Sequence, residues 1–207
     1  MSASPFTPES DPMPQTPETP SQTGKPGPLA SPAKDSIPNL QEVTPFLLRG
    51  GQPTQPGLLA LKSRGVRTVV NLRNEEILVE REAKVCRRLG LKFVNIPLDV
   101  FNCPSDRAIK QFLQVIERAD NRPVFVHCLH GQDRTGCLIA IYRIEKMGWS
   151  ADQAYAEMLA LGFRPGFSNL SSAVFARGRQ AGRPGKNPTG AQIMYDLKTR
   201  LKHSVGN

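Results

Sequence analysis

Long apolar runs are missing from this 207-residue chain. A helix that crosses a bilayer needs about 20 consecutive, mostly apolar residues, and no segment of the sequence provides them. The segment after Met1 lacks the apolar core of a secretory signal, and it is too poor in arginine for a typical mitochondrial presequence. We therefore expect a cytoplasmic protein with no transmembrane segment.

Cysteine is also scarce, and its spacing excludes two classes of site. The four thiols are Cys86, Cys103, Cys128 and Cys137. No two of them have the spacing of zinc ligands, and a chain of this length does not need disulfide bonds to fold. We therefore expect reduced thiols and no structural metal.

Apolar residues are sparse and without period in residues 1–40, which hold 10 of the 19 prolines. Such a segment cannot bury enough surface to offset the entropy lost when it becomes ordered. We therefore expect residues 1–40 to be a disordered, Pro-rich segment. The folded domain is expected to span residues 41–176.

Acidic residues are scarce in the C-terminal tail, residues 177–207, which contains seven Lys/Arg residues and a single acidic residue, Asp196. This basic tail is either a solvated extension or a contact for an acidic surface such as lipid headgroups or nucleic acid. Tyr195 is its one aromatic residue, so stacking on nucleic-acid bases has little support. Nucleic acid is therefore not an expected partner.

Strand and helix patterns alternate through residues 41–176. Runs of β-branched and apolar residues predict strands at 43–48, 66–71, 91–96 and 123–127. Capping residues and helical periodicity predict helices at 54–64, 74–89, 105–119, 135–147, 151–161 and 168–176. This order predicts an α/β fold, a single domain in which helices flank a central, mostly parallel sheet.

The most informative stretch is residues 127–136, His-Cys-Leu-His-Gly-Gln-Asp-Arg-Thr-Gly, which joins the last predicted strand to a helix. Ligands bind such sheets at the carboxyl ends of strands, and free N–H groups at a helix start bind anions. In that positive field, Cys128 should lose its proton more easily than a free thiol. The planar guanidinium of Arg134 can bind two phosphate oxygens. We therefore interpret Cys128 as a nucleophile aimed at a bound phosphate.

The rest of this loop has supporting roles in that interpretation. Backbone N–H groups that complete the phosphate site are expected from Leu129, His130, Gly131, Gln132 and Asp133. The Thr135 hydroxyl is expected to hydrogen-bond the sulfur, and His127 to support the loop from behind. No metal or other cofactor is expected, because the loop and Arg134 supply the electrostatic stabilisation.

The string His-Cys-x-x-Gly-x-x-Arg-Thr-Gly resembles the signature of the cysteine-dependent protein tyrosine and dual-specificity phosphatases. Residues 49–53 and 68–73 are similar to segments of small atypical dual-specificity phosphatases of bacteria, plants and fungi. The resemblance covers about residues 43–163. It implies a tyrosine-phosphatase-like fold and hydrolysis of a phosphomonoester through a phosphocysteine intermediate. The implied substrates are phosphorylated proteins, with phosphoinositides or inositol phosphates as the alternative.

The resemblance also implies a general acid, an aspartate on a mobile loop before the cysteine. Asp99 lies 29 residues before Cys128, after a predicted strand and in a loop bounded by prolines. Asp106 lies 22 residues before Cys128, in the first turn of a predicted helix, where a carboxylate favours the helix dipole. We prefer Asp99, and Asp106 stays the alternative.

Neighbours of the motif bear on the substrate. Asp133 either orients Arg134 or the nearby backbone, or it assists proton transfer as a second acid. The Asp-Arg pair resembles phosphatases that act on phosphoinositides as well as phosphoproteins, whereas Gln132 stands where lipid-selective members often carry a lysine. Arg49 and Arg73 either add positive charge to the rim of the cleft or are ordinary surface arginines.

Two further hypotheses concern the same residues. Cys103, in the loop of the preferred acid, either forms a reversible disulfide with oxidised Cys128 or is an ordinary thiol. The domain is alternatively a phosphate-binding module with negligible turnover. The presence of Cys128, Arg134 and an acid candidate together argues against that module.

Overall fold

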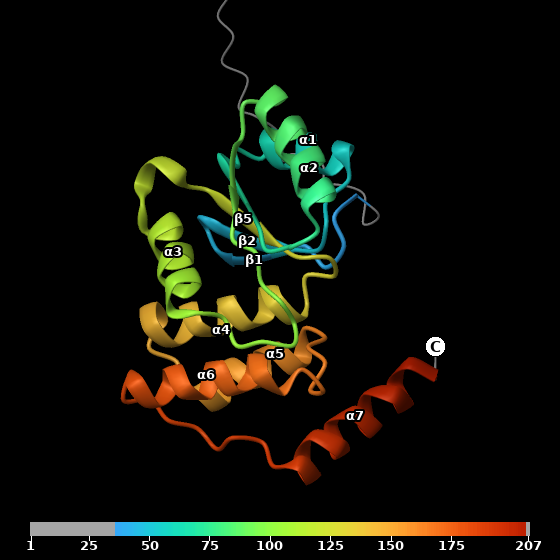
Figure 1. Ribbon diagram of the computed structural model, residues 1–207, viewed down its shortest axis with the longest axis vertical. Helices are drawn as coiled ribbons and strands as arrows, with labels where there is room; N and C mark the ends of the chain where they lie inside the picture. Colours follow the sequence, from blue (N-terminus) through green and yellow to red (C-terminus); the bar gives the residue numbers. More distant parts are fainter. Residues whose placement is uncertain (1–35, 206–207) are drawn as a thin grey trace, which may run out of the picture.

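The computed structural model describes residues 36–205, so most of the segment predicted to be disordered, residues 1–35, lies outside them. Five strands form one sheet in the order β1-β2-β5-β3-β4. Their bounds are β1 Gln41–Thr44, β2 Leu47–Gly50, β3 Thr68–Asn71, β4 Lys92–Asn95 and β5 Val124–His127. Strands β2, β5, β3 and β4 run parallel, and β1 pairs antiparallel with β2. The predicted α/β fold with a mostly parallel sheet is confirmed (Figure 1).

Within the described residues, seven α-helices and a short 3-10 helix (Ala119–Asn121) join or follow the strands. The α-helices are α1 Gln55–Ser63, α2 Glu76–Arg88, α3 Asp106–Glu117, α4 Asp133–Met147, α5 Ala151–Ala160, α6 Ser168–Gln180 and α7 Gly190–Val205. Three N-caps expected from the sequence are present, because Thr54, Ser105 and Ser150 each accept a hydrogen bond from a first-turn N–H group. These caps fix where α1, α3 and α5 begin.

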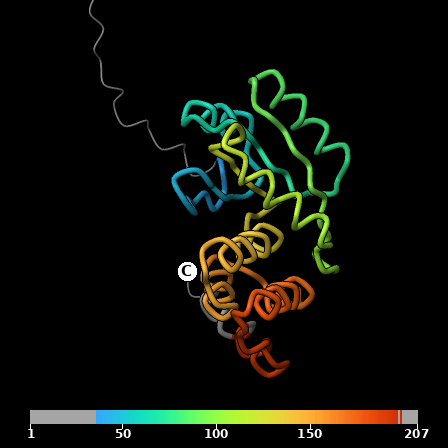
Figure 2. Tube along the Cα trace, turned by 90° about the vertical axis from the view of Figure 1, so that its left-hand side faces the viewer, coloured from blue at the N-terminus to red at the C-terminus, as the bar shows by residue number. Residues whose placement is uncertain are grey.

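The two faces of the sheet carry separate cores, as the alternation of side chains along a strand requires. Val124 and Val126 of β5 pack with α3, α4, α5 and α6 in the larger core. Phe125, which points the other way, packs with α1 and α2 in the smaller core. Figure 2 shows the molecule from the side, with α4 and the later helices gathered below the sheet. The sheet is thus covered on both faces.

Several boundaries differ from the predictions. Ile37 is buried in the smaller core, so packing begins before residue 41. The predicted strand at 43–48 is two strands joined at residues 45–46, because Pro45 has no N–H group for the ladder. Helix α6 continues past residue 176, since Gly178 leaves room for the close approach of Ala151.

The basic tail contains helix α7, which the sequence did not predict. Figure 1 shows α7 beyond α6, on the side of the helical layer away from the sheet. Within residues 36–205, no helix combines the length and the apolar character that crossing a membrane requires.

Candidate active site

The candidate site lies where β2, β5 and β3 end together. The register pairs Gly50 of β2 with His127 of β5, and His127 with Asn71 of β3. The loop that begins at Cys128 therefore has the segments after β2 and β3 on either side of it. The sequence predicted this position at the carboxyl edge of the sheet.

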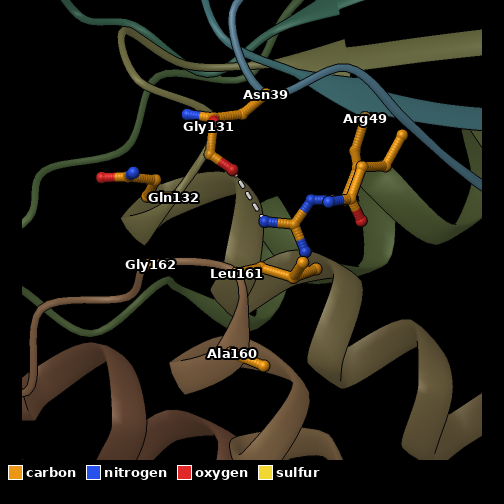
Figure 3. Close-up of a pocket in the computed structure, with 8 residues that line it drawn as sticks. Asn39, Arg49, Gly131, Gln132, Ala160, Leu161 and Gly162 are labelled. Carbon is orange, nitrogen blue, oxygen red and sulfur yellow. Dashed lines mark hydrogen bonds between the residues drawn. The ribbon is translucent and has the colours of Figure 1, made fainter. Parts of the chain in front are cut away.

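The backbone of the loop is held from its outer side. Three of its carbonyl oxygens accept hydrogen bonds there: Leu129 from the Gln52 N–H group (2.9 Å), His130 from Asn39 Nδ2 (2.9 Å) and Gly131 from Arg49 Nη2 (2.7 Å). Figure 3 shows the last of these bonds. With the carbonyl groups turned outward, the N–H groups of the same peptides face the inside of the loop. The N–H group of Gly131 lies 3.3 Å from Cys128 Sγ, so the loop can surround a tetrahedral anion above the sulfur.

Gly131 is required for this conformation. Its φ of +74° lies in the left-handed region, which side chains disfavour. A Cβ atom at this position would lie 2.3 Å from the carbonyl carbon of Gly50. The loop and the end of β2 therefore approach each other only because residue 131 has no side chain.

Arg134 lies in the first turn of α4, which begins at Asp133, two residues before the predicted start. Its side chain is mostly buried, and its Nη1 lies 3.5 Å from Asn74 Oδ1 and 3.4 Å from the carbonyl oxygen of Leu98. These contacts bring the loops after β3 and β4 to the guanidinium. Asp99 follows Leu98 directly, so it lies at the same edge as Cys128 and Arg134.

The two acid candidates have different surroundings. Asp99 is half-buried, and its carboxylate accepts hydrogen bonds from the Phe101 N–H group (3.0 Å) and Asn102 Nδ2 (2.7 Å). Asp106 begins α3, where its 90% exposed side chain pairs with Arg177 of α6 at 2.8 Å. Only Asp99 lies in a segment that contacts Arg134.

The segment around Asp99 is attached to the start of α6. The rings of Phe101 and Phe167 meet edge to face with centroids 5.8 Å apart, and Asn169 Nδ2 donates to the Phe101 carbonyl. Cys103 Sγ lies 3.2 Å from the Asn169 carbonyl oxygen. All four cysteines are free, so the structure contains no bond between Cys103 and Cys128.

Asp133 contacts Arg164 of the loop between α5 and α6. Its buried carboxylate accepts hydrogen bonds from the Arg164 backbone N–H group (2.9 Å), Nε (3.1 Å) and Nη2 (2.7 Å). Both carboxylate oxygens therefore bind Arg164, which supports the structural alternative for Asp133. The same contacts place Arg164, an arginine not singled out from the sequence, beside the site.

Arg49 and Arg73 are neither rim residues nor ordinary surface arginines, because both are buried. Arg73 donates to Gln52 Oε1 (3.0 Å) and to the Glu75 carboxylate (3.0 and 3.1 Å). Hydrogen bonds from Arg73 lower the pKa of Glu75 to about 2. The expectation that these arginines lie at the surface was wrong, since each guanidinium is buried and binds groups beside the loop.

His127 supports the loop and belongs to a buried pair that the sequence did not reveal. His127 Nδ1 lies 3.1 Å from the Cys128 carbonyl oxygen, and Nε2 lies 3.0 Å from Glu82 Oε1. Glu82 also accepts a hydrogen bond from Asn71 Nδ2. The available signal was a carboxylate on the face of α2 that also carries Ala83 and Cys86, all three buried.

Thr135 differs from its expected role. Its hydroxyl oxygen is buried and has no hydrogen-bond partner among residues 36–205, so it forms no hydrogen bond to the Cys128 sulfur here. Across the same residues, no group of three His, Cys, Asp or Glu side chains is arranged to hold a metal ion.

Comparison with known proteins identifies a family and several relatives. The family model described as DSP-PTPase phosphatase fused to NAD+ kinase matches residues 29–181. The dual specificity protein phosphatase TpbA of Pseudomonas aeruginosa is 27% identical over 147 residues, 70% of this chain and 65% of TpbA. This chain thus spans about two thirds of that relative's length.

Two further matches are a second relative and a solved structure. The inositol diphosphatase DSP2 of rice, Oryza sativa subsp. japonica, is 30% identical over 110 residues, 51% of this chain and 53% of DSP2. The crystal structure of P. aeruginosa TpbA superposes with a TM-score of 0.59 at 24% identity, covering 72% of this chain and 94% of that one. The fold of the described domain is therefore that of a phosphatase of this kind.

Proposed function

Because this chain belongs to the family described as DSP-PTPase phosphatase fused to NAD+ kinase, we propose that it hydrolyses phosphomonoesters through a phosphocysteine intermediate. The observation that carries the proposal is the loop around Cys128, whose carbonyl groups are bound from outside while the Gly131 N–H group lies 3.3 Å from the sulfur. Such a loop binds a tetrahedral anion over a nucleophile.

The reaction follows from these positions. The Cys128 thiolate attacks phosphorus in line, so that an S–P bond forms while the P–O bond to the leaving group breaks. Arg134 holds two oxygens of the phosphoryl group, and Asp99 gives its proton to the leaving oxygen. A water molecule then attacks phosphorus, loses a proton to Asp99 and releases phosphate and the thiolate.

The proposed substrates are phosphorylated proteins, as the name of the Pseudomonas relative suggests for that protein. Inositol phosphates or phosphoinositides are the second candidate. Two observations favour them as an alternative: the relative named inositol diphosphatase, and the Arg164 side chain, 46% exposed beside the loop, which can meet a second anionic group. Turnover of a matched set of phosphopeptides, phosphoinositides and soluble inositol phosphates distinguishes the two classes.

Replacement of the nucleophile tests the activity itself. Cys128→Ser should abolish hydrolysis of an aryl phosphate, while Cys103→Ser, as the exposed-thiol control, should retain it. EDTA should have no effect, because the proposed stabilisation comes from the loop and Arg134. Activity in purified Cys128→Ser protein would contradict the mechanism.

A further inference from the structure

Arg49 is a buried cation without a buried anion of its own. The residue is only 2% exposed, and its Nη1 atom has no hydrogen-bond partner among residues 36–205. The carboxylate of Glu157 is bound by another arginine, Arg143, at 2.7 and 3.3 Å. No carboxylate in the described chain forms an ion pair with Arg49.

Such an arrangement is unfavourable for the stability of the fold. A guanidinium taken out of water loses much of its solvation free energy, and an uncompensated one is costly. Burial accordingly lowers the pKa of Arg49; the negative charges of Glu157 and Cys128 act in the opposite direction, and Arg143 adds to the lowering. One of the two groups that act in the opposite direction is thus Cys128, the cysteine of the site.

A short chain of contacts joins Arg49 to that sulfur. Arg49 Nη2 donates to the Gly131 carbonyl oxygen at 2.7 Å, and the Gly131 N–H group lies 3.3 Å from Cys128 Sγ. Holding the carbonyl group restricts rotation of the residue whose N–H group meets the sulfur. Figure 3 shows the guanidinium reaching from β2 to Gly131 on the outer side of the loop.

We propose that Arg49 is a positioning residue, which orients Gly131 toward Cys128 and stabilises the thiolate with a buried positive charge. The proposal rests on Cys128 being the nucleophile, as proposed above. Other charged or titratable groups near the cysteine include His127 with its partner Glu82, and the loop residues His130, Asp133 and Arg134; those beside Arg49 are Glu157 and Arg143. Arg49 differs from these in donating to the carbonyl group of Gly131, the residue whose N–H group meets the sulfur.

The test measures the thiolate directly, by the rate at which iodoacetamide alkylates Cys128. Cys103→Ser serves as the background, because Cys103 is exposed and would react. Cys86 and Cys137 do not interfere, since burial raises the pKa of both thiols, that of Cys86 to about 12. The readout is the ratio of the rates at about pH 6 and about pH 9.

Arg49→Met removes the charge and keeps an unbranched side chain. We expect its rate ratio to fall several-fold, because a thiol that loses its proton less easily is less ionised at about pH 6 while it still reacts at about pH 9. Arg143→Met is the matched control, because Arg143 is also buried near Glu157 but makes no contact with the loop. Its thermal unfolding midpoint should fall while its rate ratio stays that of the background protein.

Arg49→Lys separates the charge from the geometry. Lysine keeps a cation but not the fork that reaches Gly131, so its ratio should lie between those of the background protein and Arg49→Met. If Arg49→Met does not fold, Arg49→Lys carries the test, and a ratio equal to the background would overturn the proposal. A rate ratio of folded Arg49→Met equal to that of the background protein would also overturn the proposal. Alkylation needs no turnover, so failure here is distinct from failure of the proposed phosphatase activity, which the Cys128→Ser assay measures.

Discussion

Replacing Glu82 by glutamine should destabilise the protein, because it removes the anion of a fully buried pair. The side chains of His127 and Glu82 are 0% and 4% exposed, with Nε2 and Oε1 3.0 Å apart, so solvent screens this pair little. Breaking a buried pair from one side costs about 3–5 kcal/mol. Glutamine keeps the shape and one acceptor oxygen for Asn71, so we expect a loss of about 2–4 kcal/mol in the free energy of unfolding.

The pH dependence of that loss gives a second, independent check. Burial acts to raise the pKa of Glu82, but the hydrogen bond and charge of His127, with hydrogen bonds from Gln52 and Asn71, hold the pKa below its ordinary value. A carboxyl group with a lowered pKa stabilises the fold above its unfolded pKa and loses that effect as the pH falls through the folded one. The difference in the free energy of unfolding between wild type and Glu82→Gln should therefore become smaller below about pH 4.

Urea unfolding at neutral and acidic pH measures both effects. Glu80→Gln is the control, since Glu80 is exposed on the same helix and should change stability by less than about 0.5 kcal/mol. Equal stability of wild type and Glu82→Gln at neutral pH would refute the reasoning. A difference in the free energy of unfolding that stays the same at acidic pH would also refute the reasoning, because the loss would then not come from the charge of Glu82.

Three other substitutions test the site. Asp99→Asn should lower kcat about 10²–10⁴-fold while Asp106→Asn, which loses only an exposed ion pair, leaves it unchanged; the reverse order would overturn the assignment of the acid. Asp133→Asn should cost about 1–3 kcal/mol in urea unfolding, because its hydrogen bonds to Arg164 weaken; unaltered stability would contradict this. Gly131→Ala should reduce aryl phosphate turnover more than about tenfold, since the added Cβ meets backbone at 2.3 Å; normal turnover would show that the loop tolerates a side chain.

Features that depend on neighbouring residues were predictable from the sequence. The strand before Cys128, the loop and the helix after it follow one another within residues 123–147, so periodicity and the motif were enough to place them. The caps Thr54, Ser105 and Ser150 are likewise local. The sheet edge then followed from the alternation of strands and helices.

Features that depend on residues far apart in the sequence were not predictable from it. Asn39 and His130, which are 91 positions apart, meet only because β2 lies beside β5. Arg49 was read as an exposed charge because nothing in its own segment reveals that Gly131, 82 positions away, accepts its hydrogen bond. Glu82 was missed for the same reason, since its partner His127 comes from another element.

The central claim is that Cys128 receives the phosphoryl group, and trapping that intermediate tests it most directly. The 207-residue chain is mixed with an aryl phosphate, quenched in acid within the first turnover and digested, and the mass of the Cys128 peptide is determined. The account predicts one added phosphoryl group on Cys128 in wild type and none on the corresponding peptide of Cys128→Ser. Turnover with no phosphate on Cys128 at any quench time, or with phosphate on another residue, would contradict it.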